Sequence, residues 1–109
     1  PPAFDLNELR EVLGSFDERT HAFMRQFVDS TPPLIDRIRQ AVAARDRQEA
    51  QRTGHTAKGA ARSVMAVELA ELFAAVERSA TDEDWPTAEA RIADLMPALQ
   101  RARDFVAKV

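Results

Sequence analysis

The segment FDERTHAFMRQFVDSTPPLIDRIRQAVAAR, residues 16–45, determines the architecture because its apolar side chains recur every three or four positions. This spacing places them along one stripe of an α-helix, as a helix that faces a core requires. The stripe consists of Phe16, Thr20, Phe23, Met24, Phe27, Val28, Thr31, Leu34, Ile35, Ile38, Ala41 and Val42. Pro32 and Pro33 remove two backbone donors, yet the stripe keeps its phase across them. We therefore predict one kinked helix, with Ser30 and Thr31 available to cap, rather than two helices meeting at a corner.

Helical spacing continues on both sides of this segment. Asp5 is placed to cap a short first helix that ends at Gly14 and Ser15. The apolar residues of that helix are Leu6, Leu9, Val12 and Leu13. A helix over about 46–64 follows the long segment, and its expected core residues are Ala50, Thr53, Ala57, Ala61 and Val64. Because these residues are small, this helix is expected to lie close to its neighbours.

Two more helices are expected after a break near Met65 and Ala66. The inward residues of the first are Leu69, Leu72, Phe73 and Val76. Asp84 is expected to cap the last helix, with Pro86 in its first turn and a kink at Pro97. The inward residues of this last helix are Ala88, Ile92, Leu95, Met96, Leu99, Ala102 and Val106. We predict an all-α fold, an antiparallel up-down four-helix bundle with a short N-terminal helix that covers one end.

The overall composition sets limits on function. The 109 residues predict a single domain over 1–109, with residues 1–3 as the remnant of a linker. A net charge of −3 gives no support to nucleic-acid binding, and no apolar run approaches the roughly 18 residues of a membrane span. The chain has no cysteine, which excludes disulfides and thiolate chemistry and fits a cytoplasmic location.

The run Gly54-His55-Thr56-Ala57-Lys58-Gly59 is the candidate functional site. Two of the three glycines in the chain lie here, although each glycine costs a helix roughly 1 kcal/mol relative to alanine. We interpret them as bare backbone that lets another protein reach an exposed imidazole. Residues one turn from His55 share its face, and we expect four of them to take part in docking or charge compensation, Gln51, Arg52, Lys58 and Gly59, with Arg62 a further turn on.

This face suits a phosphoryl carrier. A neutral imidazole is a competent nucleophile near pH 7, and Lys58 is expected to offset the charge of a phosphoryl group on His55. The chain has no GxxxxGK[ST] or kinase-type glycine loop, and no carboxylate is placed to hold Mg²⁺. A partner would therefore supply the metal and the catalytic pocket, and no cofactor and no autonomous kinase activity are expected of this chain.

The motif His-Thr-Ala-Lys-Gly at 55–59 resembles that of histidine-containing phosphotransfer (HPt) domains. Phe4 to Leu9 resembles the opening of HPt modules at the C-terminal end of hybrid sensor kinases, and Ala75-Val76-Glu77 resembles the end of the helix after the motif. The resemblance implies a four-helix bundle in which His55 is the phosphoacceptor, Lys58 its basic neighbour and Gly59 the residue that admits the partner. It also implies receiver domains as partners, with a histidine kinase in cis or in trans as a further one.

Two positions depart from the family pattern. Ala57 stands where the family has a large aliphatic residue, and Met65 stands where it has a glycine in the turn. A non-glycine residue with positive φ costs of order 1 kcal/mol, so we expect either another turn geometry or a longer helix. Two other functions stay open: a non-catalytic helical interaction module, and the phosphoacceptor domain of a chemotaxis-type kinase.

The remaining notable side chains are interpreted as structural. His21 is expected to be ordinary surface, and Trp85 a packing anchor for the last helix. The aromatic residues expected in the core are Phe16, Phe23, Phe27, Phe73 and Phe105.

Overall fold

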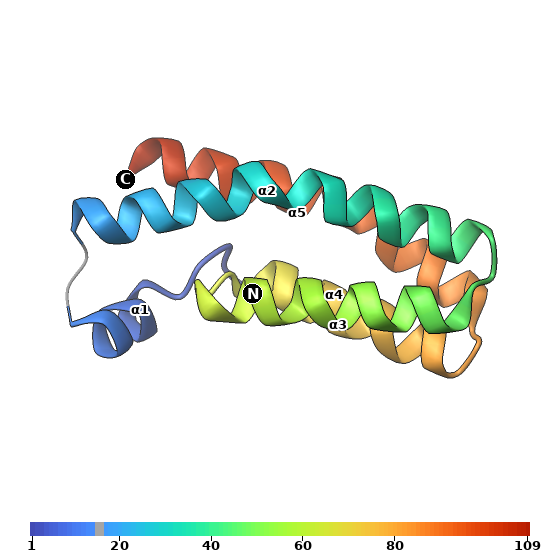
Figure 1. The fold of residues 1–109 in the computed structure, drawn as a ribbon. Coiled ribbons are helices and arrows are strands. Elements are labelled where there is room, and N and C mark those ends of the chain that lie inside the picture. Colours follow the sequence, from blue (N-terminus) through green and yellow to red (C-terminus); the bar gives the residue numbers. More distant parts are fainter. Residues whose placement is uncertain (15–16) are drawn as a thin grey trace.

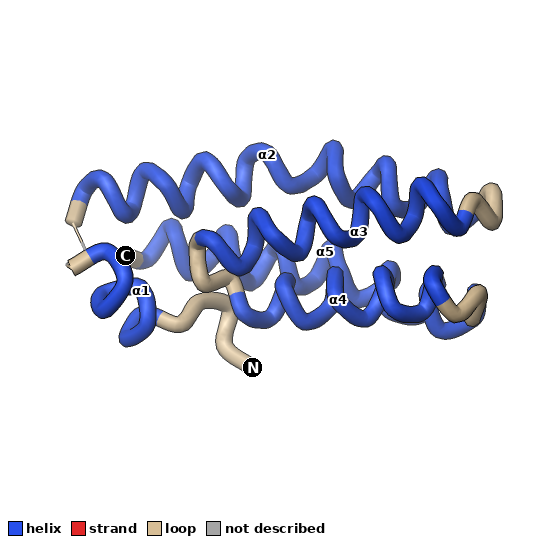
Figure 2. Tube along the Cα trace, turned by 60° about the horizontal axis from the view of Figure 1, so that its bottom comes forward, coloured by secondary structure: helices blue, strands red, loops and turns tan. Residues whose placement is uncertain are grey.

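Five helices account for most of the chain in a computed structural model that describes residues 1–14 and 17–109. They are α1 (Leu6–Leu13), α2 (Glu18–Ala43), α3 (Arg47–Ser63), α4 (Val67–Thr81) and α5 (Trp85–Lys108). No strand occurs among the described residues, so the fold is all-helical, as predicted. The four long helices lie side by side in a body of 42 × 21 × 20 Å, and α1 lies at one end (Figures 1 and 2). Helices α2 and α4 each pack against both α3 and α5.

Aspartates begin four of the five helices. The side chains of Asp5, Asp17, Asp46 and Asp84 accept hydrogen bonds from backbone N–H groups at 3.0, 3.1, 3.1 and 3.3 Å. These bonds satisfy donors that the first helical turn leaves without partners. The predicted caps at Asp5 and Asp84 are confirmed, and Pro86 lies in the first turn of α5 as expected.

Helix α2 is continuous through Pro32 and Pro33, which confirms the prediction of one helix. Ser30 and Thr31 do not cap backbone N–H groups there. Their hydroxyls instead donate to the carbonyl oxygen of Phe27, at 3.2 and 2.6 Å. The prediction that they were available as caps is therefore wrong, because no second helix begins at this point.

Two residues predicted to face inward are exposed. Phe23 is 45% exposed and Met96 is 41% exposed, so both predictions are wrong. Phe23 lies at the edge of the buried stripe of α2, beside small residues of α3 that are too short to cover its ring. Met96 lies beside Leu95 at the edge of the stripe of α5, whose buried residues are Ala88, Ile92, Leu95, Ala98, Leu99, Ala102 and Val106. Ser15 and Phe16, and the side chains of Val12 and Leu13, lie outside what the structure describes.

Helix α3 packs closely on α4 through small residues, as predicted. Ala50, Thr53, Ala57 and Ala61 are buried, and so is Gly54. A Cβ atom on Gly54 would lie 3.4 Å from both the Cα and the Cβ of Glu77 in α4. Gly54 therefore faces the neighbouring helix rather than an approaching protein. Our interpretation of it as bare backbone on the open face is wrong.

The three turns between the long helices share one geometry. Arg45, Met65 and Glu83 have φ values of 55, 56 and 55°, in the left-handed region. In each turn the next residue's N–H donates to a carbonyl five residues earlier: Asp46 to Ala41, Ala66 to Ala61 and Asp84 to Ser79. This is the Schellman arrangement. Both of our expectations for Met65 are wrong, because the turn keeps the left-handed cap and the helix ends there.

Side chains far apart in sequence hold the bundle ends. His21 Nε2 lies 2.8 Å from the carbonyl oxygen of Val106 in the last turn of α5, so His21 is not ordinary surface. A carbonyl oxygen only accepts, so this nitrogen of His21 donates to a helix terminus that lacks intrahelical donors. Trp85 is half-buried against the core, and the guanidinium of Arg45 lies 5.6 Å from its ring. At the end where His21 meets α5, and far from Trp85, the rings of Phe4 and Phe105 lie 5.3 Å apart.

Candidate functional site

His55 stands on the exposed side of α3. Its side chain is 71% exposed, whereas the residues on the opposite side of the helix are buried in the bundle. The exposure follows from the helical period, because His55 lies between the buried positions Gly54 and Ala57 and points away from the side of the helix that they share. The sequence-based expectation of an exposed imidazole is confirmed.

A carboxylate from α4 holds the imidazole. Glu77 Oε2 lies 2.8 Å from His55 Nδ1, and Glu77 Oε1 lies 2.6 Å from Lys58 Nζ. The side chains of Glu77 and Lys58 are only 17% and 16% exposed. Burial raises the pKa of Glu77, but hydrogen bonds from Lys58 and His55 outweigh it and leave this pKa below its usual value. Glu77 is therefore ionised near neutral pH.

The contact with Glu77 determines which nitrogen of His55 can react. An ionised carboxylate only accepts hydrogen bonds, so Nδ1 carries the proton and donates it. In the neutral imidazole Nε2 then keeps its lone pair, and it lies on the edge of the ring away from Glu77. The site therefore presents the Nε2 edge of His55 to solvent, and the hydrogen bond from Nδ1 to Glu77 sets the orientation of the ring.

Sequence reasoning missed the contact of Glu77 with His55. In the sequence, residues 75–77 show only a resemblance to the end of a family helix. The available signal was a carboxylate on the helix that follows the motif, but the sequence does not give the register between two helices. Gly54 provides that register, because its missing side chain brings α3 close to Glu77.

A hollow of about 350 Å³ opens beside His55. It is lined by Gln48, Gln51, Arg52, His55, Thr56 and Glu77. The structure thus brings Gln51 and Arg52, two of the expected docking residues, next to the imidazole. In this structure Arg52 pairs with Glu49, whose pKa falls to about 2, chiefly because of the hydrogen bond from Arg52.

Gly59 and Arg62 lie one and two turns beyond His55, outside the lining of this hollow. A Cβ atom on Gly59 would meet no atom within 4 Å, so Gly59 has open space above it. Arg62 is exposed. Of the two glycines in the motif, Gly59 is therefore the one that leaves the surface beside His55 free of a side chain.

An exposed aromatic side chain extends this surface onto α2. Phe23 lines two shallow hollows between α2 and α3, and Ser63 lines both of them as well. Ala60, the neighbour of Gly59, lines one of the two. An apolar ring at this position suits contact with another protein. The sequence predicted Phe23 as core and so missed it as a docking residue.

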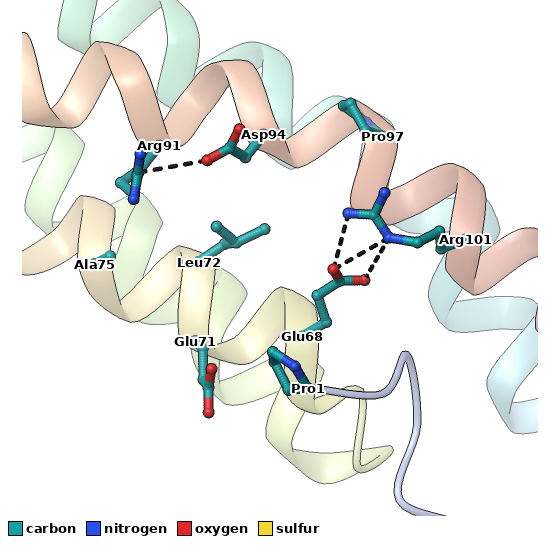
Figure 3. Close-up of a pocket in the computed structure, with 9 residues that line it drawn as sticks. All are labelled: Pro1, Glu68, Glu71, Leu72, Ala75, Arg91, Asp94, Pro97 and Arg101. Carbon is teal, nitrogen blue, oxygen red and sulfur yellow. Dashed lines mark hydrogen bonds and ion pairs between the residues drawn. The ribbon is translucent and has the colours of Figure 1, made fainter.

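A second hollow, of about 440 Å³, lies between α4 and α5 (Figure 3). Four of the charged side chains that line it form two pairs: Arg101 bridges to Glu68 at 2.8 Å, and Arg91 pairs with Asp94 at 3.5 Å. The hollow lies on the side of α4 that faces α5, whereas Glu77 faces α3. It contains no histidine, so the chemistry points to the α3 site.

Within residues 1–14 and 17–109, no three His, Asp or Glu side chains lie together so that they could hold a metal ion. Over the same residues, no helix is both long and apolar enough to pass through a membrane.

Comparison with known families gives one match. A family model described as the Hpt domain matches residues 22–102, which include all of α3 and α4 and therefore His55, Lys58 and Glu77. No curated protein and no solved structure matches the chain significantly.

Proposed function

Because the chain belongs to the Hpt domain family, whose members carry out histidine phosphotransfer in phosphorelays, we propose that His55 is its phosphoacceptor. The observation that supports this best is the contact of His55 Nδ1 with Glu77, which leaves an exposed Nε2 as the nucleophile. The partners of Hpt domains are receiver domains of response regulators and histidine kinases in general. We assign this chain the role of a phosphocarrier between receivers, on an antiparallel up-down bundle with α1 over one end.

The proposed reaction is a direct transfer between two side chains. The lone pair of Nε2 attacks the phosphorus of an aspartyl phosphate on the receiver. The N–P bond forms as the P–O bond breaks, and the electron pair of that bond stays on the receiver carboxylate. Nδ1 keeps its proton, and Glu77 stabilises the positive charge that develops on the ring. The return step to a second receiver reverses these bonds. Mg²⁺ belongs to the receiver, and this chain supplies no cofactor.

The receiver docks on the surface around His55 in this proposal. Gly59 lets the backbone of the receiver come close to α3. Polar contacts come from Gln51, Arg52 and Arg62, and Phe23 is an apolar contact at the edge of the surface. This surface extends from α3 to α2 and leaves the charged hollow between α4 and α5 uncovered.

A transfer assay tests the proposal. Incubation with a phosphorylated receiver should add one acid-labile, base-stable phosphate to the wild-type domain. His55→Gln should gain none while its helical circular dichroism stays unchanged, and His21→Gln should label normally. Radiolabelled ATP and Mg²⁺ alone should label neither protein. If a panel of phosphorylated receivers leaves the wild-type domain unlabelled, the chain is a non-catalytic interaction module instead.

A further inference from the structure

Arg52 lines the same hollow as the imidazole of His55 and is held by a different carboxylate, that of Glu49. We propose that Arg52 is the residue that neutralises the phosphoryl group on His55. Phosphorylation then moves its guanidinium from Glu49 to the phosphoryl oxygens. This inference rests on the proposed function of His55 and adds a switch in side-chain pairing to it.

Lys58 lies on the Nδ1 side of the His55 ring, away from Nε2. Its Nζ lies 2.6 Å from Glu77 Oε1, on the side of the ring where Glu77 holds Nδ1. A phosphoryl group on Nε2 projects from the other edge of the ring. Lys58 therefore stabilises and positions Glu77, and another cation must meet the phosphoryl group.

Arg52 is placed to be that cation. It precedes His55 by three residues on α3, and residues at this spacing are neighbours on a helix surface. Side chains on a helix lean toward its N-terminus, so the ring of His55 leans over the turn that carries Arg52. Both residues line the same hollow of about 350 Å³. The guanidinium has a planar set of donors that matches phosphoryl oxygens in a bidentate contact.

Glu49 can release Arg52 without losing all its partners. Arg52 bonds to Oε2 of Glu49, while Arg37 and Thr53 bond to Oε1 at 3.2 and 3.0 Å. After the switch, Oε1 keeps both of these bonds. The phosphoryl group carries a larger negative charge than a carboxylate, so it competes well for the guanidinium. The Arg52 side chain is 67% exposed and has room to turn.

The experiment measures the charge next to the phosphoryl group by ³¹P NMR. Phosphoramidate donates a phosphoryl group to an exposed imidazole without any docking protein, and the His55 resonance is the one missing in His55→Gln. In Arg52→Gln the pH midpoint of this resonance should rise by roughly half a unit or more, the effect of losing one nearby positive charge. Arg52→Lys should restore most of the shift. Arg62→Gln, which removes an arginine from the same helix, should leave the midpoint within about 0.2 units of wild type.

The unphosphorylated domain provides the control for a merely structural effect. There Arg52 pairs with Glu49 and not with the imidazole, so Arg52→Gln should leave both the helical circular dichroism and the ¹⁵N signature of the Nδ1-protonated ring of His55 unchanged. Equal ³¹P midpoints in Arg52→Gln and wild type would overturn the assignment, as would a larger shift in Lys58→Gln than in Arg52→Gln. Neither result affects the proposed function, which fails only if phosphorylated receivers transfer nothing to His55.

Discussion

Replacement of Glu77 by glutamine removes one charge from the site and keeps the shape of the side chain. Glu77 accepts from His55 Nδ1 at 2.8 Å through one oxygen and from Lys58 Nζ at 2.6 Å through the other. A glutamine has one carbonyl oxygen, so it can accept from only one of these donors in the same geometry. The other donor then faces an NH₂ group. We expect losses in both stability and transfer rate.

The size of each loss follows from burial and from the role of the ring. Lys58 and Glu77 are less than one-fifth exposed, at 16% and 17%. In burial, the Lys58–Glu77 ion pair is intermediate between two classes. Exposed ion pairs stabilise a protein by up to about 1 kcal/mol, and breaking a buried ion pair costs about 3–5 kcal/mol. Glu77→Gln should therefore lower the free energy of unfolding by about 1–2 kcal/mol. Loss of a carboxylate that orients a metal-bound histidine typically costs about ten- to a hundredfold, and we expect transfer from His55 to slow by a similar factor.

Three measurements test this reasoning. Denaturant unfolding gives the stability, rapid-quench transfer from a phosphorylated receiver gives the rate, and ¹⁵N NMR reports which ring nitrogen of His55 is protonated. Glu71→Gln, on the same helix but facing the hollow between α4 and α5, is the matched control and should change none of them. If Glu77→Gln keeps the Nδ1-protonated tautomer and the wild-type rate, the carboxylate does not orient the nucleophile.

The structure makes further predictions. Gly59→Gln should melt no lower than wild type, since glycine is a poor helix former, yet transfer from a receiver should slow at least tenfold, about 1.4 kcal/mol, while reaction with phosphoramidate changes little; equal receiver rates would contradict the open surface. Phe23→Ser should weaken receiver binding about tenfold in calorimetry, the effect of losing roughly 1.5 kcal/mol of apolar burial at the interface, while the melting temperature falls only modestly because the ring is 45% exposed in the free domain. Glu83→Gly should raise the unfolding free energy by about 0.5–1 kcal/mol, because φ is 55° there, whereas Glu83→Ala should not. The pKa of Glu49 is lowered from 4.5 to about 2, so its ionised form contributes stability that is complete above pH 4.5 and is lost as the pH falls toward 2; Glu49→Gln should therefore flatten acid unfolding over this window.

The sequence predicts the helices well because their buried stripes are regular. Ile35, Ile38 and Leu99 are fully buried, as their spacing indicates, and the aspartate caps mark where helices begin. The errors occur at the edges of the stripes. Phe23 and Met96 have the correct helical angle to be partly inward, but their burial depends on the size of residues on another helix. Helical periodicity contains no information about that neighbour.

The candidate site divides in the same way. The sequence identifies His55 and Gly59 because exposure and missing side chains on one helix follow from local spacing. It does not identify the role of Glu77, which reaches the site from a separate helix, or the paired state of Lys58. These depend on the register between α3 and α4, a property of the packed bundle.

Gly54 allows α3 and α4 to pack closely enough for Glu77 to reach His55. An alanine Cβ at this position would lie 3.4 Å from the Cα and Cβ of Glu77, an ordinary contact, but any longer side chain would meet the α4 backbone. The helices would then have to move apart, and the carboxylate of Glu77 would move away from Nδ1. A chain that kept His55, Lys58 and Gly59 but carried a bulky residue at position 54 would present the same exposed motif without a fixed tautomer. The reactivity of His55 therefore depends on the α3–α4 distance as well as on the residues that share its face.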